Sequence, residues 1–399
     1  MKALVIGPGR IGCGFVGQLL RASGMKVVFA ARTPALADHL NRVGQYRVRL
    51  VNGREMREIT VDGVRAVPTS EFELVVEEIA KVDLIAIAVG ANNLPDIAPL
   101  IAAGLRRRST PLNVIAFENM ADAGTYLRCL VTSRLPADYP IAQHGFSGAL
   151  VSRAVTERLG DLSKDEPLVF VGDPPATFVV DGMGLRPPLP VIEGMLVTDN
   201  FSAWMLRKLY TFSAGHATAA YLAYLKGYHF IHTAIHDPEI RAAVLSAMSE
   251  GQRALAARYG PAVAGDESDL LEIISRFENA ALNDPVARVG RDPQRKLGAE
   301  DRLVGAARLA EAVGVCPEKL ALAAAAALCF DNPDDPSAAE LQYEIEKDGV
   351  GPALNRISGL DMRSGVGRSI ADTRNRLARG WHHGNLLLSL DRLLWTWTV

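Results

Sequence analysis

A glycine-rich turn near the start of the chain constrains the fold more than any other feature. KALVIG (residues 2–7) is a short apolar run typical of a buried strand, and GPGRIG places Gly7, Gly9 and Gly12 in the GxGxxG spacing. IGCGFVGQLLRASG (residues 11–24) then has helical periodicity and ends on Gly24. A strand, this turn and a helix in that order predict a dinucleotide-binding unit.

Each glycine has its own task in such a turn. Gly7 permits the tight bend, Gly9 lets a pyrophosphate approach the backbone, and Gly12 lets the helix lie close to the sheet. The start of the helix offers free N–H groups and partial positive charge to the phosphates. Glycines that serve only a packed turn remain the alternative. The residues predicted to contact the cofactor are Gly7, Gly9, Arg10, Ile11, Gly12, Arg32 and Val89.

The end of the second strand bears on which cofactor binds. A cofactor with a free ribose 2′-hydroxyl usually meets a carboxylate about 20 residues past the glycines. The sequence there is FAART, with Ala31 at the strand end and Arg32 beside it. A guanidinium pairs with a 2′-phosphate, which a carboxylate repels. We therefore expect NADP(H) to be preferred and NAD(H) to be possible, unless Arg32 is only a solvated surface residue.

Strand and helix patterns alternate through the first half of the chain. Strands are expected at 25–31, 82–90 and 111–117, helices at 34–43, 72–81 and 94–108, and a β-ribbon at 46–51 and 56–67. Residues 145–192 are expected to supply the last strands and the crossover. The sequence is then almost entirely helical from Thr198 to residue 380. We predict an α/β fold with a Rossmann-type doubly wound sheet at 1–192, followed by a mostly α-helical domain at 193–385.

Composition excludes several classes of protein. The 399 residues carry a formal net charge of −2 without a basic arm, which argues against a nucleic-acid partner. The four cysteines form no CxxC pair, so we expect free thiols, a cytoplasmic location and no metal site. The chain enters a strand at once and has no long apolar run, so we expect neither a signal peptide nor a membrane partner.

Several long stretches resemble the polyol-specific long-chain dehydrogenases, and among them the mannitol-1-phosphate 5-dehydrogenases. They include GPGRIGCGFVG, PLNVIAFENM, RKLYTFSAGHATAAYL and RFENAALNDPVARVGRDPQRKLGAEDRL. The resemblance covers most of residues 1–365 but not the last ~30. It implies a metal-independent, nicotinamide-dependent enzyme that interconverts a polyol, or its phosphate, with the ketose. Mannitol 1-phosphate and fructose 6-phosphate are the default pair.

The resemblance also implies the catalytic residues. The family has a lysine, then an asparagine five residues on and a histidine eight residues on, in one helix. Lys208 and His216 match, whereas Ser213 replaces the asparagine. Asn119 matches a further family asparagine that holds the reacting oxygen. Lys208 is the expected general base, although a lone helical lysine is usually only solvated, His216 can be a core histidine, and Ser213 can serve packing alone.

Two further comparisons with the family concern substrate and specificity. The family's VDRI reads VSRA here, so Ser152 replaces an aspartate while Arg153 is retained. In the family the segment VARVGRDPQRKL borders the substrate, which suggests Arg295 and Lys296 as substrate contacts. A solvated turn is the alternative. Asn200 is either a substrate contact or a helix N-cap.

The replacements at Ser213 and Ser152 leave the substrate open. A reductase of another sugar or cyclitol in a biosynthetic pathway is one alternative, and a non-catalytic NADP-binding protein is another. The expected partner is a small polyol or ketose, and the chain is expected to be a monomer or a homodimer. Residues 386–399, apolar around Asp391 and Arg392, are predicted to be a docked tail or else a dimer contact.

Overall fold

The structure is a computed structural model that describes residues 1–53, 55–120, 122–361 and 363–382. The chain divides into two compact units, Met1–Ser202 and Ala203–Val399, called here the first and second unit. The domain boundary expected between residues 192 and 193 stays a prediction. The expected tail at 386–399 lies outside the described residues.

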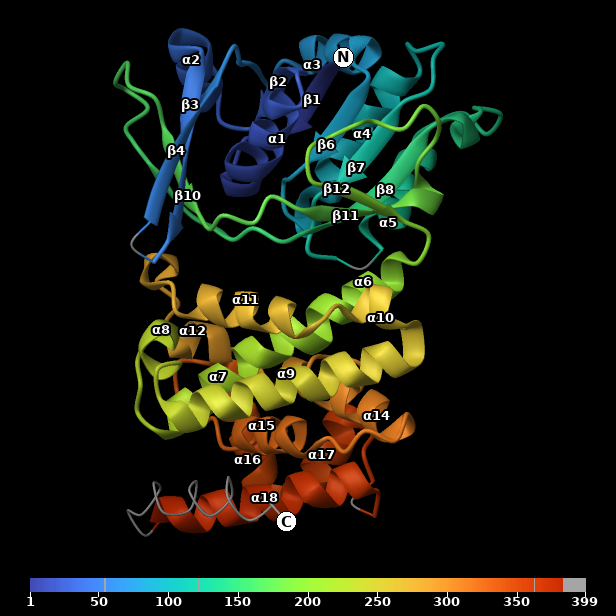
Figure 1. Ribbon diagram of the computed structural model, residues 1–399. Helices are drawn as coiled ribbons and strands as arrows, with labels where there is room; N and C mark the ends of the chain where they lie inside the picture. The colour runs from blue at the N-terminus through green and yellow to red at the C-terminus, as the bar shows by residue number, and fades with distance from the viewer. Residues whose placement is uncertain (54, 121, 362, 383–399) are drawn as a thin grey trace. The chain divides into compact units, whose positions relative to one another are not determined.

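An eight-stranded sheet forms the centre of the first unit, in the order β12-β11-β8-β7-β6-β1-β2-β5 (Figure 1). Adjacent strands are parallel except β8 and β11. Strands such as KALVI and LIAI are buried along nearly their whole length, as a parallel sheet covered on both faces requires. The strands are β1 (Lys2–Ile6), β2 (Lys26–Ala31), β5 (Arg65–Pro68), β6 (Leu84–Ile87), β7 (Asn113–Ala116), β8 (Gly145–Val151), β11 (Phe178–Asp181) and β12 (Met195–Thr198).

Helices cover both faces of this sheet and produce two apolar clusters. One cluster includes Phe15, Leu19 and Leu40, and the other includes Val75 and Ile101. This arrangement confirms the predicted doubly wound α/β architecture. On the first face lie η1 (Gly12–Gly17), α1 (Gln18–Ala22) and α2 (Pro34–Val43), and on the second lie α3 (Phe72–Lys81), α4 (Leu94–Leu105) and α5 (Ala123–Thr132). Short 3-10 turns are η2 (Ala91–Asn93), η3 (Ile141–Gln143) and η4 (Gly182–Gly184).

A second, four-stranded sheet corrects part of the sequence prediction. Its order is β4-β3-β10-β9, with β3 (Gln45–Asn52), β4 (Glu55–Asp62), β9 (Val155–Leu159) and β10 (Val169–Gly172). The expected ribbon exists as β3 and β4, but residues 65–68 join the large sheet as β5. The expectation that 145–192 supplies only the large sheet was wrong, because β10 pairs with β3. Pairing between segments so distant in sequence leaves no trace in a local pattern.

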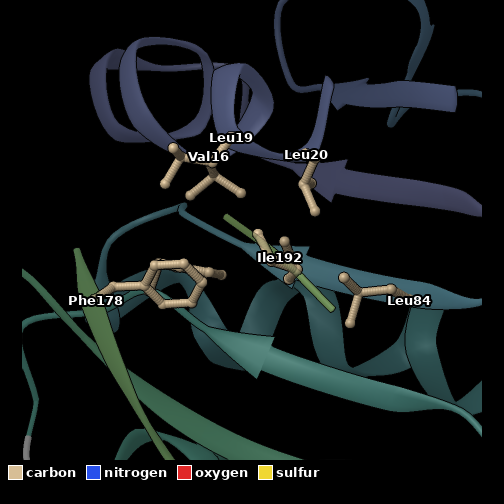
Figure 2. A pocket seen from close by; sticks show the side chains of 8 residues that line it. Val16, Leu19, Leu20, Leu84, Phe178 and Ile192 are labelled. Carbon is tan, nitrogen blue, oxygen red and sulfur yellow. The ribbon is translucent and has the colours of Figure 1, made fainter. Parts of the chain in front are cut away.

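An apolar gap too narrow for a water molecule lies between the helix that follows the glycine turn and the large sheet (Figure 2). Its lining contains no polar side chain, so it belongs to the hydrophobic core and offers nothing to hold a charged cofactor. The lining residues are Val16, Leu19, Leu20, Leu84, Ala86, Phe117, Phe178 and Ile192.

The second unit is mostly helical, as predicted. Alanine-rich α7 and α15 are buried along nearly their whole length in one apolar cluster, and their small side chains let neighbouring helices approach closely. The helices are α6 (Phe201–Lys208), π-helical η5 (Leu209–Ser213), α7 (Ala214–Leu225), α8 (Ile231–Ala234), α9 (Pro238–Tyr259), α10 (Pro261–Ala264), α11 (Glu267–Phe277), η6 (Ala280–Leu282), α12 (Val286–Gly290), α13 (Pro293–Lys296), α14 (Val304–Ala312), α15 (Glu318–Ala327), α16 (Pro336–Asp348), α17 (Val350–Ser358) and α18 (Gly365–His382).

Candidate active site

The glycine turn has the shape that a pyrophosphate requires. Gly7 has a φ of 96°, and a Cβ there would lie 2.5 Å from the Ala88 carbonyl oxygen. A Cβ on Gly12 would lie 2.0 Å from the Gly7 carbonyl oxygen. A Cβ on Gly9, by contrast, would meet no atom within 4 Å, so the backbone there is open to a ligand. The first N–H groups of the following helix have no intrahelical acceptor, and they can bind phosphate oxygens.

Arg10 and Ile11 flank this opening in different ways. The exposed Arg10 side chain donates to the Thr156 carbonyl oxygen at 2.9 Å, which ties the turn to β9 of the small sheet. Ile11 is half-buried and packs against the apolar cluster beneath the helix. Arg10 therefore offers a ligand mainly its backbone, while Ile11 seats the start of the helix.

Arg32 follows β2 directly, at the carboxyl end of the sheet. Its side chain is exposed, and no hydrogen bond or ion pair of its guanidinium is found among the described residues. The Gly7 N–H donates to the Ala30 carbonyl oxygen at 3.0 Å, so the end of β2 lies beside the glycine turn. A guanidinium in this place is available to a phosphate on the adenine ribose.

A buried carboxylate that the sequence analysis did not single out holds the loop after β6. Glu118, just past the end of β7, accepts the backbone N–H groups of Val89 at 2.8 Å and Gly90 at 2.9 Å. Its side chain is 9% exposed, and burial raises the pKa of Glu118. The only sequence signal was its place next to Asn119 in AFENM. Val89, expected to contact the cofactor, is thus part of a loop fixed by β7.

Asn119 is the exposed neighbour of this carboxylate. No hydrogen bond of its amide side chain is found within the described ranges, so both its donor and its acceptor are available. An amide N–H at the carboxyl end of β7 can hold the oxygen of a reacting carbinol or ketone. The expected role of Asn119 stays a proposal.

Lys208 is the last residue of α6, immediately before a π-helical turn. The turn η5 carries Ser213 at its end, and α7 with His216 follows it. An α-helix places residues five apart about 140° apart around its axis. A π-turn accommodates an extra residue, and so it brings Ser213 closer to the face of Lys208 than a regular helix would. Turns of this kind occur frequently at functional sites.

Close packing explains the glycines around this turn. A Cβ on Gly251 of α9 would lie 2.1 Å from the Tyr210 carbonyl oxygen inside η5. Gly215 lets α9 approach in the same way, because a Cβ there would lie 2.5 Å from the Met248 sulfur. The irregularity of this helix is the π-turn η5.

Burial and neighbouring positive charge both lower the pKa of Lys208. Burial, followed by the Arg276 and Arg302 guanidinium groups, lowers the pKa of Lys208 to about 8. The side chain is half-buried and lies on the same helical run as Ser213 and His216. An amine with this pKa can take and return a proton near neutral pH.

His216 lies between aromatic rings and a carboxylate. Its ring stacks on Phe277 at 5.0 Å between centroids, and its Nε2 is 3.1 Å from Asp284 Oδ2, in an orientation that does not form a hydrogen bond. Asp284 also pairs with Arg288. Burial, and then Arg288, lowers the pKa of His216 to about 3. Its side chain keeps 19% exposure, although Nε2 itself is buried.

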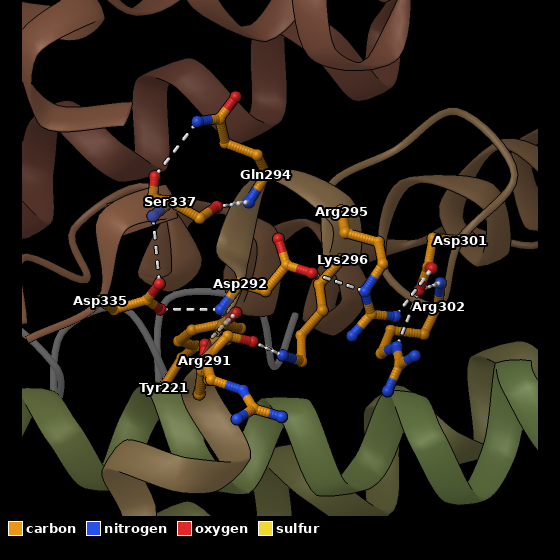
Figure 3. A network of polar contacts seen from close by, with 11 residues as sticks. Tyr221, Arg291, Asp292, Gln294, Arg295, Lys296, Asp301, Arg302, Asp335 and Ser337 are labelled. Atoms are coloured by element: carbon orange, nitrogen blue, oxygen red, sulfur yellow. Dashed lines mark hydrogen bonds and ion pairs between the residues drawn. The ribbon is translucent and has the colours of Figure 1, made fainter. Parts of the chain in front are cut away.

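A polar network fixes the segment that carries the expected substrate contacts (Figure 3). Asp292 adopts a left-handed conformation with φ of 61°, and its N–H donates to Asp335 Oδ2 at 2.7 Å. Its carboxylate accepts from Arg295 Nε at 2.7 Å, and Arg295 also approaches Asp301 at 3.6 Å. The Arg295 side chain is 53% exposed, so a substrate contact by Arg295 stays a prediction.

Lys296 faces inward in the same segment. It is 4% exposed, and its Nζ donates to the Arg291 carbonyl oxygen (Figure 3). Burial, with Arg302 and Arg295, lowers the pKa of Lys296 to about 8. The cations that lower the pKa of Lys208 or of His216 all belong to the second unit. Together with Lys208 itself we call them the cationic cluster: Lys208, Arg276, Arg288, Lys296 and Arg302.

The remaining residues singled out from the sequence have local partners. Asn200 directly precedes α6, and its Oδ1 accepts from the Ser202 hydroxyl at 3.3 Å, as in a helix start. The Ser152 hydroxyl donates to the Thr177 carbonyl oxygen. Arg153 is 4% exposed and donates at 2.9 Å to both the Gly14 carbonyl oxygen and Gln18 Oε1. Arg153 therefore braces the helix that begins at the glycine turn.

Neither a metal-type cluster nor a helix of membrane-spanning character occurs among the described residues. No cluster of three or more His, Cys, Asp or Glu side chains suited to a metal ion occurs in the part of the chain that the structure describes. Within the same ranges, no helix has both the length and the apolar character of a membrane span. The four cysteines are free, as expected.

Comparisons with known proteins match the two units in turn. The mannitol dehydrogenase Rossmann domain matches residues 1–194, and the mannitol dehydrogenase C-terminal domain matches residues 200–364. Among solved structures, mannitol 2-dehydrogenase of Pseudomonas fluorescens, in a ternary complex with NAD and D-mannitol, is 16% identical with a TM-score of 0.69. The alignment covers 99% of this chain and 94% of that one.

A second solved structure has the same fold. D-sorbitol dehydrogenase in substrate-free form is 15% identical, with a TM-score of 0.78 over 97% of this chain and 94% of that one. At such low identity the two solved structures show the fold alone, whereas the domain matches span most of the sequence.

Proposed function

This chain belongs to the mannitol dehydrogenase family, and we propose that it interconverts a polyol phosphate with its ketose phosphate, using NADP(H) and a lysine general base. Mannitol 1-phosphate and fructose 6-phosphate are the default pair. The observation that carries the proposal is the state of Lys208, whose pKa is lowered to about 8 by burial and two guanidinium groups. Nicotinamide-dependent oxidation of an alcohol needs such a base for the hydroxyl proton.

The proton and the hydride leave the carbinol by separate routes. A bound nicotinamide would supply the acceptor for the carbinol hydride in oxidation and the hydride donor in reduction. Neutral Lys208 removes the hydroxyl proton as the C=O bond forms. In the opposite direction, protonated Lys208 gives that proton to the carbonyl oxygen.

Three further side chains bind and orient the substrate in this proposal. The Asn119 amide donates to the reacting oxygen and stabilises the charge that develops on it. The Ser213 hydroxyl supplies one donor where the family pattern has an amide. His216 stays neutral because its pKa is lowered to about 3, so its ring exchanges hydrogen bonds with a substrate hydroxyl without adding charge.

The cationic cluster supports a phosphorylated substrate. Asp284 pairs with Arg288, and Asp301 pairs with Arg302. Arg276 lies over the Phe212 ring at 4.6 Å and is one of the groups that lower the pKa of Lys208. Guanidinium and ammonium groups gathered in one place are the groups that bind a phosphate dianion by charge-assisted hydrogen bonds.

Two features support the proposed preference for NADP(H). Ala31 stands where a carboxylate would hold a free 2′-hydroxyl, and the exposed guanidinium of Arg32 follows it. The open approach to Gly9 fits the pyrophosphate that NAD(H) and NADP(H) share.

A substrate panel tests the proposal directly. NADPH oxidation is followed at its absorbance band with phosphorylated and plain ketoses, and fructose 6-phosphate is expected to turn over fastest. Lys208→Ala should lower turnover on the order of 10²–10⁴-fold while the Kd for NADPH stays the same. Near-normal turnover of this variant would remove Lys208 as the base. Oxidation with no member of the panel would remove the enzymatic proposal altogether.

A further inference from the structure

We propose that Glu118 has two functions: one carboxylate oxygen fixes the loop after β6, and the other accepts a hydrogen bond from the nicotinamide half of the bound dinucleotide. The inference deepens the proposed function and rests on it for the identity of the cofactor. It is separate from the chemistry of Lys208, because it concerns binding alone.

The first function follows from convergent backbone contacts. The N–H groups of Val89 and Gly90 both donate to Oε1 of Glu118, at 2.8 and 2.9 Å. Gly90 has a φ of 90°, a backbone conformation that glycine adopts readily and other residues rarely do. Asn93 closes the loop from the other side, with Nδ2 donating to the Val89 carbonyl oxygen at 2.7 Å. The loop is therefore held in one conformation without using Oε2.

The second function follows from the oxygen that remains. Among the described residues, no group donates to Oε2 of Glu118, although the residue is only 9% exposed. A carboxylate removed from water loses hydration, and that loss is offset only where donors replace the water. Oε2 is not among the buried atoms that lack a partner, so this oxygen reaches solvent while the rest of the carboxylate is covered. A ligand donor at this edge of the sheet can replace water at Oε2.

The place of Glu118 in the sheet identifies the part of the ligand that it meets. Strand order reverses between β1 and β6, and a dinucleotide lies across such a reversal at the carboxyl ends of the strands. Its adenine ribose lies at the end of β2, near Arg32, and its pyrophosphate lies over Gly9. The other half then extends over β6 and β7. The Phe117 N–H donates to the Ile87 carbonyl oxygen at 2.8 Å, so Glu118 stands at that edge.

The nicotinamide half offers two kinds of donor to a carboxylate. Its carboxamide carries N–H groups, and its ribose carries hydroxyl groups. Both make charge-assisted hydrogen bonds with a carboxylate oxygen, and these are stronger than bonds between neutral groups. The adenine half provides no donor near β7, so only ligands that carry the nicotinamide riboside should depend on Glu118.

Substitution by glutamine separates the two functions. Glu118→Gln keeps a carbonyl oxygen for the Val89 and Gly90 N–H groups but replaces the other acceptor by a donating NH₂ group. Glu118→Ala removes both. Glu166→Gln is the matched control, because Glu166 is exposed in the same unit. Dissociation constants for NADP⁺ and for adenosine 2′,5′-bisphosphate are measured by calorimetry, and the thermal midpoint of each ligand-free variant is recorded.

The expected result is a loss of affinity for NADP⁺ but not for the adenosine probe. Glu118→Gln should bind NADP⁺ about 10-fold or more weakly than the wild type, with unchanged affinity for adenosine 2′,5′-bisphosphate and an unchanged thermal midpoint. The 3-acetylpyridine analogue of NADP⁺ lacks the carboxamide N–H. If wild type and Glu118→Gln bind that analogue equally, the donor is the carboxamide, and if the loss persists, it is a ribose hydroxyl.

Three other outcomes would overturn the inference. Unchanged NADP⁺ affinity in Glu118→Gln would remove the acceptor role. Equal losses for both ligands together with a lower thermal midpoint would reduce Glu118 to a structural residue. A wild-type protein that binds the adenosine probe and NADP⁺ equally well has no nicotinamide contact of this kind. Failure of the proposed function has a different signature, because the wild type would then bind neither ligand.

Discussion

An amine surrounded by guanidinium groups holds its proton weakly, and this property suits Lys208 to the chemistry proposed for it. Burial removes water that would stabilise the ammonium, while Arg276 and Arg302 add repulsion. The same groups make the site attractive to an anion. One arrangement of charge therefore both activates the base and favours a phosphorylated substrate.

The pH dependence of turnover should report Lys208. Oxidation needs the neutral amine, so its rate should rise with pH and level off above about 8, the pKa of Lys208. Reduction needs the ammonium, so its rate should fall over the same range. Initial rates in both directions between about pH 6 and 10 provide the measurement. Parallel profiles in the two directions would contradict the assignment.

Arg32 should determine the choice of cofactor. Arg32→Ala is expected to weaken NADP(H) binding by roughly 10–100-fold, because a charge-assisted pair with the 2′-phosphate is lost, and to leave NAD(H) binding nearly unchanged. Fluorescence titration with both reduced cofactors measures this. Arg106→Ala, at another exposed arginine of the first unit, is the control. Equal losses for both cofactors would mean that Arg32 does not contact the 2′-phosphate.

At the scale of elements, the structure positions its functional groups by irregularities in helices. The π-helical η1 follows the glycine turn, and the π-helical η5 separates Lys208 from His216. Arg153 braces η1 through the Gly14 carbonyl oxygen, and Gly251 lets α9 approach η5. Periodicity along the sequence predicted helices in both places, as found. It did not predict the π-turns, because their stabilising contacts come from residues distant in the chain.

The start of α15 depends on a carboxylate from α9. Glu250 is 4% exposed and accepts the Lys319 N–H at 2.8 Å and the Leu320 N–H at 2.9 Å. Burial raises the pKa of Glu250 from 4.5 to about 7. The folded protein therefore binds this proton more tightly than the unfolded chain does. The stability that Glu250 contributes is fully present below pH 4.5 and is lost as pH rises through about 7.

Glu250→Gln should remove this pH dependence. Between pH 4.5 and about 8 the wild type loses the stabilising effect of one bound proton, and the variant does not. The difference in unfolding free energy between variant and wild type is therefore expected to shift in favour of the variant by about 1–3 kcal/mol. Urea unfolding at several pH values measures it. A difference that stays constant with pH would show that Glu250 titrates alike in the folded and unfolded states.

At the scale of the whole molecule, the protein has separate hydrophobic cores in its two units. The clusters of the first unit lie on the two faces of the large sheet, and that of the second unit lies among its helices. All four tryptophans (Trp204, Trp381, Trp395 and Trp397) come after the point of division. Tryptophan fluorescence therefore comes entirely from the chain after Ser202, whereas far-ultraviolet circular dichroism follows both units.

Cofactor binding should shift the unfolding transitions that these two probes follow by different amounts. NADP⁺ at 100 times its Kd adds about 2.7 kcal/mol to the unit that binds it. Because the glycine turn and Arg32 belong to the first unit, the circular dichroism transition should move to higher temperature while the tryptophan transition moves less. An equal shift of both transitions would show that the units unfold as one cooperative block.

The features that can be predicted from the sequence are those that depend on interactions between residues close together in the chain. Local patterns predict the doubly wound fold, the helical second half and the glycine turn. Strand and helix periodicity and the GxGxxG spacing each involve only a few neighbouring residues. The family stretches likewise indicated Lys208, His216 and Asn119 as candidates. The small sheet, the contact of Glu118 with Val89 and Gly90, and the inward position of Lys296 emerged only from tertiary structure. So did the identity of the guanidinium groups, Arg276 and Arg302, that add to the effect of burial on the pKa of Lys208. Burial and electrostatic fields are set by whatever the folded chain brings close, and no local pattern records them.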